Sequence, residues 1–380
     1  MSNTFVKLGS VAEFINGAAF KPQDWGESGL RIIRIQNLTD PNKPFNRTEK
    51  TVSELVRVQP RDLLVSWSAT LGVFEWNDSE EALLNQHIFR VLPNKKIVDK
   101  RYLRHGLEVA ILDMKKHLHG ATMQHVNRGE FLSTKFYLPP LEEQKRIAEI
   151  LDQAEELRRK RKEAIALLDT LTQSIFLEMF GDPNSILHLW KIDKLGNILD
   201  FITTGSRGWA AYYAESGDLF LRIQNVRWDE LVLDDIAFVK APESAEARRT
   251  KVQPGDVLLS MTADIGRTAV VPEGIETAYI NQHLAILRAK SINSQFLSSY
   301  FASPTGKKQV QGRNRQGVKS GLNFDDVRSF IIPLPPLSLQ KEFSQRVEAV
   351  EELKKSHRAS LSELDALFAS LQHRAFKGEL

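Results

Sequence analysis

Basic and amide side chains gather between residues 307 and 319, and their types match the chemistry of nucleic-acid binding. Lysine and arginine bind phosphates, arginine can bridge two acceptors on guanine, and asparagine or glutamine can do the same on adenine. Glycines interrupt the segment, so we expect a loop that contacts DNA. The expected phosphate contacts are Lys307 and Lys308, and the other expected contacts are Arg313, Asn314, Arg315, Gln316 and Lys319.

Further candidate DNA contacts occur in pairs of loops, one in each half of the chain. Those of the first half are Lys21, Trp67, Thr70, Gln124, His125 and Arg128. Those of the second half are Arg207, Trp209 and Arg267. Taken singly, each loop is typical of a solvated turn, and their paired placement is the observation that favours DNA contact.

The sequence holds no convincing motif for catalysis. The nearest phosphate-loop match, Gly312 to Ser320, has one residue too many before its lysine and no helix-forming stretch after it. Residues 143–145 match only the tail of a nuclease-like carboxylate–lysine pattern. Zero cysteines exclude a thiolate nucleophile and a Cys-ligated zinc. We therefore expect no catalytic residue and no cofactor bound by this chain.

The histidines of the sequence could bind a metal ion or have a structural role. His117, His119 and His125 lie close together in sequence, but the matching segment of the second half has no histidine, so we expect no metal site. Asn85-Gln86-His87 and its copy Asn281-Gln282-His283 stand beside apolar strands. This pattern favours a buried, hydrogen-bonded triplet that fixes strand and loop geometry.

These segments belong to an internal repeat that runs through the chain. Leu8-Gly9 returns as Leu195-Gly196, 187 residues later, and the offset grows to 196 at the Asn-Gln-His triplet. Other repeated motifs are Arg34-Ile35-Gln36-Asn37 with Arg222-Ile223-Gln224-Asn225, Val58-Gln59-Pro60 with Val252-Gln253-Pro254, and Leu138-Pro139-Pro140-Leu141 with Leu334-Pro335-Pro336-Leu337. A period this long indicates duplicated domains, since solenoid repeats run at about 20–50 residues.

Each half reads as a mixed α/β region followed by one long helix. The Pro-Pro pairs suit a helix start, and neither glycine nor proline follows until Gly181 and Gly378. About 40 residues at 1.5 Å each make a rod of about 60 Å. The apolar stripes include Ile147, Ala154, Leu157, Leu168 and Leu171, and Val350, Leu353, Leu364 and Leu367. We expect the two stripes to pair with each other, although each helix could instead lie on its own globular part.

The composition is that of a folded protein that stays inside the cell. Apolar residues make up 42% and charged residues 26%, which argues against disorder. The net charge of +3 falls mainly in the two α/β regions, which permits nucleic-acid binding without establishing it. Since no apolar run is long enough for a membrane span and the N-terminus lacks signal-peptide features, we expect a cytoplasmic protein.

At this point the architecture resembles the specificity (S) subunit of a type I restriction–modification system. The resemblance is carried by the repeated LPPLEEQKRIAEIL and LPPLSLQKEF helix starts, FLEMFGDP at the end of the first helix, and the paired Val-Gln-Pro and Asn-Gln-His segments. It covers essentially the whole chain. The second copy departs from the first by carrying Ser338-Leu339 where the first has Glu142-Glu143.

The resemblance implies a non-catalytic, sequence-specific DNA-binding subunit. Residues 1–139 and 183–334 would be two α+β target-recognition domains, each reading one half of a bipartite, asymmetric target in double-stranded DNA. Residues 140–182 and 335–380 would be antiparallel coiled-coil spacer helices with pseudo-two-fold symmetry. They would dock two modification (M) subunits, which methylate adenine with S-adenosylmethionine, and restriction (R) subunits that use ATP and Mg would join.

Two other classes of function are alternatives to a DNA specificity subunit. The chain could be a self-contained DNA methyltransferase or nuclease with duplicated target-recognition domains, or a coiled-coil adaptor that does not bind DNA. An Asn/Asp-Pro-Pro-Tyr motif would favour the methyltransferase, and the sequence has none.

Overall fold

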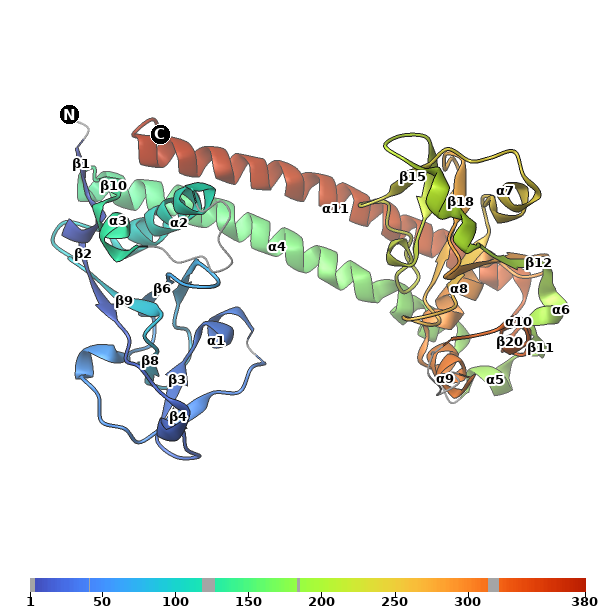
Figure 1. The fold of residues 1–380 in the computed structure, drawn as a ribbon, viewed down its shortest axis with the longest axis horizontal. Helices are drawn as coiled ribbons and strands as arrows, with labels where there is room; N and C mark the ends of the chain where they lie inside the picture. Colours follow the sequence, from blue (N-terminus) through green and yellow to red (C-terminus); the bar gives the residue numbers. More distant parts are fainter. Residues whose placement is uncertain (1–3, 41, 118–126, 183–184, 314–320) are drawn as a thin grey trace. The chain divides into compact units, whose positions relative to one another are not determined.

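The computed structural model describes residues 4–40, 42–117, 127–182, 185–313 and 321–380. The chain forms two compact units (Figure 1). Unit 1 comprises Met1–Lys162 and Ala359–Leu380, and unit 2 comprises Glu163–Arg358. Each unit thus contains one α/β part and one portion of each long helix. The expected domain boundaries at 139, 182 and 334 remain a prediction, because these units divide the helices internally.

Unit 1 contains two four-stranded sheets and one strand pair. The first sheet has the order β2-β9-β6-β7 and is antiparallel throughout. The second has the order β4-β3-β8-β5, in which β3 and β8 are parallel. The strands are β1 Phe5–Lys7, β2 Ala12–Asn16, β3 Leu30–Ile33, β4 Asn46–Thr48, β5 Arg57–Val58, β6 Leu63–Ser66, β7 Gly72–Glu75, β8 Ala82–Leu84, β9 Ile88–Pro93 and β10 Lys135–Tyr137, with β1 paired to β10.

Unit 2 repeats this arrangement except for one edge strand of the second sheet, because β13 lies beside β15 whereas β5 lies beside β8 in unit 1. Its sheets have the orders β12-β19-β16-β17 and β13-β15-β14-β18, and β11 pairs with β20. The parallel pair of the second sheet is now β14 and β18. The strands are β11 Ile192–Lys194, β12 Leu199–Thr204, β13 Tyr213–Ala214, β14 Asp218–Leu221, β15 Ala237–Val239, β16 Val257–Ser260, β17 Thr268–Val270, β18 Ala278–Ile280, β19 Leu284–Ala289 and β20 Ile331–Pro333. The duplicated mixed α/β fold class is confirmed.

Helices connect and cover these sheets. The α-helices are α1 Ile35–Thr39, α2 Lys100–His117, α3 Arg128–Ser133, α4 Leu141–Phe180, α5 Ile186–Leu189, α6 Leu195–Ile198, α7 Ala245–Thr250, α8 Ser294–Ala302, α9 Pro304–Arg313, α10 Phe324–Arg328 and α11 Leu337–Lys377. The 3-10 turns are η1 Leu8–Ser10, η2 Pro22–Asp24, η3 Glu54–Val56, η4 Arg207–Tyr212 and η5 Ile223–Asn225. Both expected long helices are present, and each begins one residue after its Pro-Pro pair.

The repeated polar residues hold the fold together at matching points. Gln144 is buried, and its Nε2 donates to Pro139 O at 2.7 Å while its Oε1 accepts from Asp99 N at 2.9 Å. Gln340 makes the same bonds in unit 2, to Pro335 O and from Asn293 N. Through these hydrogen bonds, the Leu-Pro-Pro-Leu-x-x-Gln motif links the start of a long helix to the start of α2 in unit 1 and to the start of α8 in unit 2.

Two other repeated motifs are also explained by backbone contacts. In the Arg-Ile-Gln-Asn motif, Asn37 Oδ1 accepts from Arg34 N at 3.1 Å, and the matching Asn225 accepts from Arg222 N. In the Val-Gln-Pro-x-Asp motif, the aspartate accepts from the backbone N–H of the glutamine, at 2.8 Å for Asp62. Buried polar side chains that satisfy backbone groups are costly to replace, so each half retains them.

The two long helices pack side by side within each unit. In unit 1, Arg158 of α4 pairs with Asp365 of α11. In unit 2, Lys354 Nζ of α11 lies 3.3 Å from Asp169 Oδ1 of α4. The first half of α4 thus meets the last half of α11 in unit 1, and the last half of α4 meets the first half of α11 in unit 2. The pairing is antiparallel, as expected.

The expected apolar seam is only partly buried. Ile147, Ala154 and Val350 are buried, and Leu168 and Leu364 are half-buried. Four stripe leucines are exposed instead, namely Leu157 (54%), Leu171 (38%), Leu353 (51%) and Leu367 (50%). The expectation that these four line the helix–helix seam was wrong. Phe176 of α4 and Phe368 of α11 point into the cores instead, so another face of each helix is buried and the four leucines are left exposed.

Candidate nucleic-acid interface

Three loops of unit 1 meet at one edge of its antiparallel sheet. Residue Asn16, at the end of β2, lies opposite Phe89, and Ser66, at the end of β6, lies opposite both Ile88 and Gly72. The loops 17–21, 67–71 and 85–87 therefore leave or enter the sheet at the same edge. This set of three loops is named the loop edge of unit 1.

Unit 2 presents the corresponding loop edge. Thr204 lies opposite Ala285, Ser260 lies opposite Leu284, and Leu259 lies opposite Thr268. The loops 205–209, 261–267 and 281–283 therefore gather at one edge of the matching sheet. The repeat in sequence has become a repeat of a loop cluster in space.

The turn between β6 and β7 and the turn between β16 and β17 share a serine hydrogen bond and a left-handed alanine. Ser66 Oγ donates to Thr70 O, and the matching serine of unit 2 donates to Asp264 O. Ala69 and Ala263 have φ of 56° and 57°, a left-handed conformation that non-glycine residues rarely adopt. Thr70 and Asp264, which follow, are exposed. These two features are the same in both units, while the exposed side chain that follows the alanine differs.

Close backbone approach explains a glycine in each first loop. A Cβ atom on Gly17 would lie 2.2 Å from Asn85 O, and one on Gly205 would lie 2.3 Å from Ile280 O. Any side chain at these positions would therefore push the first loop away from the third. The absence of a side chain at Gly17 and Gly205 therefore allows the first loop of each unit to pack closely against the third.

The structure divides the Asn-Gln-His triplet into two parts. Asn281 is buried and its Oδ1 accepts from His283 N at 3.1 Å, as a structural role requires. Gln282 and His283 are partly exposed, and Gln282 Nε2 lies 2.9 Å from His283 Nε2. In unit 1 the same pair, Gln86 and His87, is separated by 3.2 Å and Gln86 is exposed. The expectation of a fully buried triplet therefore holds only for Asn281, because Asn85 is partly exposed.

Sequence reasoning missed these Gln–His pairs as candidate contacts. The available signal was that the pair is identical in both halves and stands at a strand start. A structural asparagine alone would not require either neighbour to be retained. At the loop edges, the pairs offer amide and imidazole groups suited to hydrogen bonds with bases or phosphates.

The second loops of the two edges differ in chemistry. Trp67 is half-buried, with its ring 5.6 Å from that of His87 and 5.8 Å from that of Phe89. Its counterpart Met261 is buried, and here Thr262 Oγ1 contacts His283 Nδ1 at 2.6 Å. The expected contacts Trp67 and Thr70 therefore lie at the loop edge of unit 1.

Arg267 also lies at its loop edge, beside an acid. Its guanidinium is 2.9 Å from Asp264 Oδ2, and its backbone N–H binds Ser260 Oγ. The ion pair orients the guanidinium across the turn. Lys21 and Arg207, which belong to the first loops, are exposed.

Trp209 does not lie on the surface. It is 3% exposed, and its ring packs 5.3 Å from that of Phe220 and 4.9 Å from that of Tyr279. The expectation of a DNA contact at this tryptophan is wrong, because the indole fills the core of the sheet β13-β15-β14-β18.

The basic segment at 307–313 is a helix and not a loop. Arg313 ends α9, and its guanidinium donates to Ser329 Oγ and Ser329 O while lying 4.8 Å from the Phe330 ring. Lys307 Nζ lies 4.2 Å from the Trp228 ring, while Lys308 is exposed. The Arg313 guanidinium is thus engaged by the fold, which corrects the expectation that it reads bases. Lys307 and Lys308 remain candidate phosphate contacts, because Lys307 is only partly buried and the Trp228 ring it contacts is exposed.

Several expected contacts lie outside the described residues. They are Gln124, His125, Asn314, Arg315, Gln316 and Lys319. Of the described residues that follow these segments, Arg128 donates to Phe14 O in the middle of β2 at 3.1 Å, and Gly321 pairs with Thr262 of the loop edge of unit 2. His117 and His119 likewise carry no described side chain.

One cluster in the described part of the chain has the residue types of a metal site. His105 Nε2 lies 2.8 Å from Asp152 Oδ1, and Glu155 is beside them. The Arg104 guanidinium, however, binds Asp152 at 3.0 Å and Glu155 at 2.6 Å. The carboxylates are therefore neutralised by an arginine, and the cluster joins α2 to α4.

A second polar cluster joins the loop before β15 to the helices of unit 2. Asp229, with φ of 61°, accepts from Ser299 Oγ and from Gln295 Nε2 at 3.1 Å. Burial raises the pKa of Asp229 to about 7. Its neighbour Glu230 pairs with Arg358 of α11 at 2.9 Å. These contacts fix the α/β part of unit 2 on α8 and α11.

A duplicated α/β frame that presents two loop edges of different composition defines a recognition protein with two binding surfaces. The chain belongs to the type I restriction modification DNA specificity domain family, whose model matches residues 2–167 and 229–366. It is a non-catalytic DNA specificity subunit of this family, which supports the main interpretation over a self-contained methyltransferase or nuclease.

Similar proteins span almost the same length. The EcoBI specificity subunit of Escherichia coli is 25% identical over 99% of this chain and 85% of its own length. The MjaVIII specificity subunit of Methanocaldococcus jannaschii is 22% identical over 99% and 92%. In fold, the chain resembles the S subunit from M. genitalium, with a TM-score of 0.58 and 14% identity over 99% of this chain and 96% of that one.

A second solved structure, from a study of complex assembly and conformational transition in a type I R-M system, has a TM-score of 0.61 and 20% identity over 99% of this chain and 98% of that one. Among the described residues, every helix is too short or too polar to span a membrane.

Proposed function

We propose that this chain reads a bipartite, asymmetric target in double-stranded DNA, with each loop edge reading one half. The observation that carries the proposal is the shared backbone of the two edges combined with their different side chains. Ala69 and Ala263 take the same left-handed conformation, yet Thr70 follows one and Asp264 the other. One frame with two sets of contacts suits two different half-sites.

The proposal includes partner subunits that act on the bound DNA. We assign methylation of adenine to two modification subunits that use S-adenosylmethionine, and cleavage to restriction subunits that use ATP and Mg. The chain then supplies DNA recognition in the cytoplasm. This division of labour is supported by family membership.

The exposed leucines of the helix pair are the proposed docking surface for modification subunits. Unit 1 exposes Leu157 of α4 and Leu367 of α11, and unit 2 exposes Leu171 and Leu353. On each helix the two leucines are 14 residues apart, close to four turns, so they lie on nearly one face. Because each unit has one leucine from each helix, we propose one modification subunit per unit.

Loop exchange tests the division of the target between the two edges. Residues 67–71 would be replaced by 261–265 in the chain assembled with its modification subunit. Methylation of a random duplex library should change only in the half-site assigned to unit 1. The reverse exchange should change only the other half-site. Changes in both half-sites from one exchange would contradict the proposal, as would the absence of sequence-specific binding by the unaltered complex.

Charge placed on the helix pair tests the docking surface. Leu157→Asp with Leu367→Asp should reduce the number of modification subunits that co-purify with the chain from two to one, because the site on unit 1 is lost. The circular dichroism spectrum should remain unchanged. The matched control is Leu55→Asp, which alters a leucine of equal exposure (52%) on η3. Normal assembly of the double variant would rule out this surface.

A further inference from the structure

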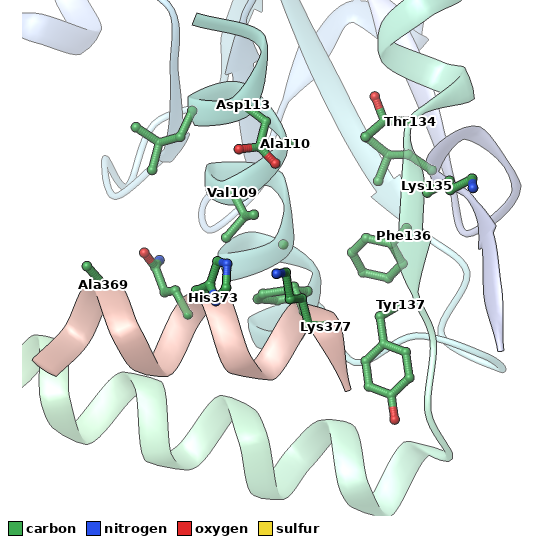
Figure 2. A pocket seen from close by; sticks show the side chains of 15 residues that line it. Val109, Ala110, Asp113, Thr134, Lys135, Phe136, Tyr137, Ala369, His373 and Lys377 are labelled. Carbon is green, nitrogen blue, oxygen red and sulfur yellow. The ribbon is translucent and has the colours of Figure 1, made fainter. Parts of the chain in front are cut away.

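An apolar groove of about 500 Å³ opens in unit 1, away from the loops discussed above. Figure 2 shows it between α2, β10 and the last turns of α11. Its apolar lining includes Val109, Ala110, Phe136 and Phe376, and Phe136 points into it. A Cβ atom on Gly106 would lie 2.3 Å from the Phe136 ring and 2.7 Å from the Phe376 ring, so both rings close over this glycine. They form an aromatic floor.

In unit 2, the position that corresponds to this groove is covered by a short segment of the same chain. Because of the repeat, β20 corresponds to β10, and the end of α4 corresponds to the end of α11. The short helix α5 packs on β20, and Ile186 is 1% exposed in the same core as Phe180. Trp190 Nε1 donates to Phe180 O at 2.8 Å, and Leu187 and Trp190 pack against this core, whereas Leu189 is exposed. A single apolar helical turn therefore covers this place in unit 2.

The two sites differ in the residue that faces the strand. In unit 2, α8 carries Tyr300, whose hydroxyl donates to Ile331 O in β20 at 2.9 Å. At the matching position α2 carries Gly106. The missing side chain leaves room for the Phe136 and Phe376 rings and for a groove beside them.

The rim of the groove adds a charge preference. Lys135, His373 and Lys377 stand on it, and Asp113 is the acidic residue among its lining residues. Figure 2 places His373 and Lys377 along α11, facing β10. A segment that enters the groove therefore meets more basic than acidic groups.

We propose that this groove binds a short amphipathic helix of a partner protein. The helix would place aliphatic residues at its first and second positions and an aromatic residue at its fifth, as Ile186, Leu187 and Trp190 do in unit 2, with an acidic residue toward the basic rim. The groove gives the end of α11 a protein-binding site distinct from the exposed leucines and from both loop edges.

A synthetic peptide with the sequence of residues 182–191, DPNSILHLWK, is the probe. It should bind the full-length chain saturably in a fluorescence anisotropy titration. Ala369→Trp, which fills the groove from an exposed position on α11, should weaken binding by about tenfold or more, a loss of about 1.4 kcal/mol. The matched control Ala366→Trp, exposed on α11 outside the groove lining, should change it by less than about twofold.

A peptide with serine in place of Ile186, Leu187 and Trp190 should not compete. Absence of saturable binding to the unaltered chain would overturn the proposal, as would equal losses from the two tryptophan variants. Each variant is compared by circular dichroism and thermal unfolding. If Ala369→Trp does not fold, Lys377→Glu provides the second measurement, because reversing charge at the rim should repel Asp182 of the peptide and weaken binding without filling the groove.

Discussion

The Nε atom of Arg158 lies 2.5 Å from the Oδ1 atom of Asp365, which joins α4 to α11 within unit 1. The same guanidinium lies 4.4 Å from the centre of the Phe368 ring, and that ring is 7% exposed. One side chain therefore supplies both an ion pair and a cation–π contact across the helix pair.

Arg158→Ala is expected to lower the free energy of unfolding by about 1–2 kcal/mol. A partly exposed ion pair contributes up to about 1 kcal/mol, and a cation–π contact adds a similar amount. Urea denaturation measures the change. Arg159→Ala is the control, because Arg159 is exposed and pairs with Glu156 of its own helix, and we expect a loss below about 0.5 kcal/mol. Equal losses would show that the contacts across the helices add nothing.

Gln144→Leu is expected to cost about 2–4 kcal/mol of stability. The change leaves Asp99 N and the carbonyl groups of Ile97 and Pro139 without their buried partner. Thermal and urea unfolding of the variant provide the measurement. Gln153→Leu, at an exposed site of the same helix, should change the stability by less than about 0.5 kcal/mol. A tolerated Gln144→Leu would mean that water replaces the side-chain bonds.

Gln282→Ala with His283→Ala is expected to weaken DNA binding without changing the sequence read. The proposed half-sites differ, whereas the Gln–His pair is the same in both units, so it should contact the sugar–phosphate backbone common to all sequences. We expect a loss of about 1–2 kcal/mol for cognate and non-cognate duplexes alike. Binding of the assembled complex to duplexes altered in one half-site at a time gives the measurement. Relaxed choice at a single base pair would instead identify the pair as a base reader.

Asp229→Asn is expected to raise the melting temperature at pH 8 and to have little effect at pH 4. The pKa of Asp229 in the folded protein is about 7, above the ordinary aspartate value of 3.8, so folding favours the protonated carboxyl. The wild-type protein therefore loses stability as pH rises from about 4 to about 7, and the loss is constant above that range. Asparagine avoids this loss and retains hydrogen-bonding capacity.

Differential scanning calorimetry at several pH values would show the difference between Asp229→Asn and the wild type growing through this range. Asp234→Asn, at an exposed site, should show no such dependence. A melting-temperature difference independent of pH would contradict a raised pKa at Asp229.

The duplication, the fold class and the two long helices could be predicted from the sequence. Repeated motifs in a fixed order require homologous domains, and long stretches without glycine or proline after Pro-Pro pairs favour helices. The motifs recognised in this way are the ones that bind the backbone. Gln144 and Gln340 can be found by pattern because their buried bonds leave little freedom to change.

Side-chain exposure could not be predicted, because it depends on which elements pack together. Trp209 and Arg313 match surface chemistry by residue type, yet one fills an aromatic core and the other binds Ser329. Leu157 and Leu353 fit a seam by spacing, yet both are exposed. Heptad spacing defines a stripe on a helix, whereas the partner elements decide how much of that stripe is covered.

The sequence by itself determined a duplicated DNA specificity subunit with paired loops and paired helices. Only the tertiary structure decided that three separate loops share one sheet edge, that Gln282 and His283 face outward beside a buried Asn281, and that a groove opens at the end of α11. The physical reason is that local patterns fix the conformation of each segment. The position of a side chain relative to solvent is fixed by long-range strand pairing and packing between residues far apart in the chain.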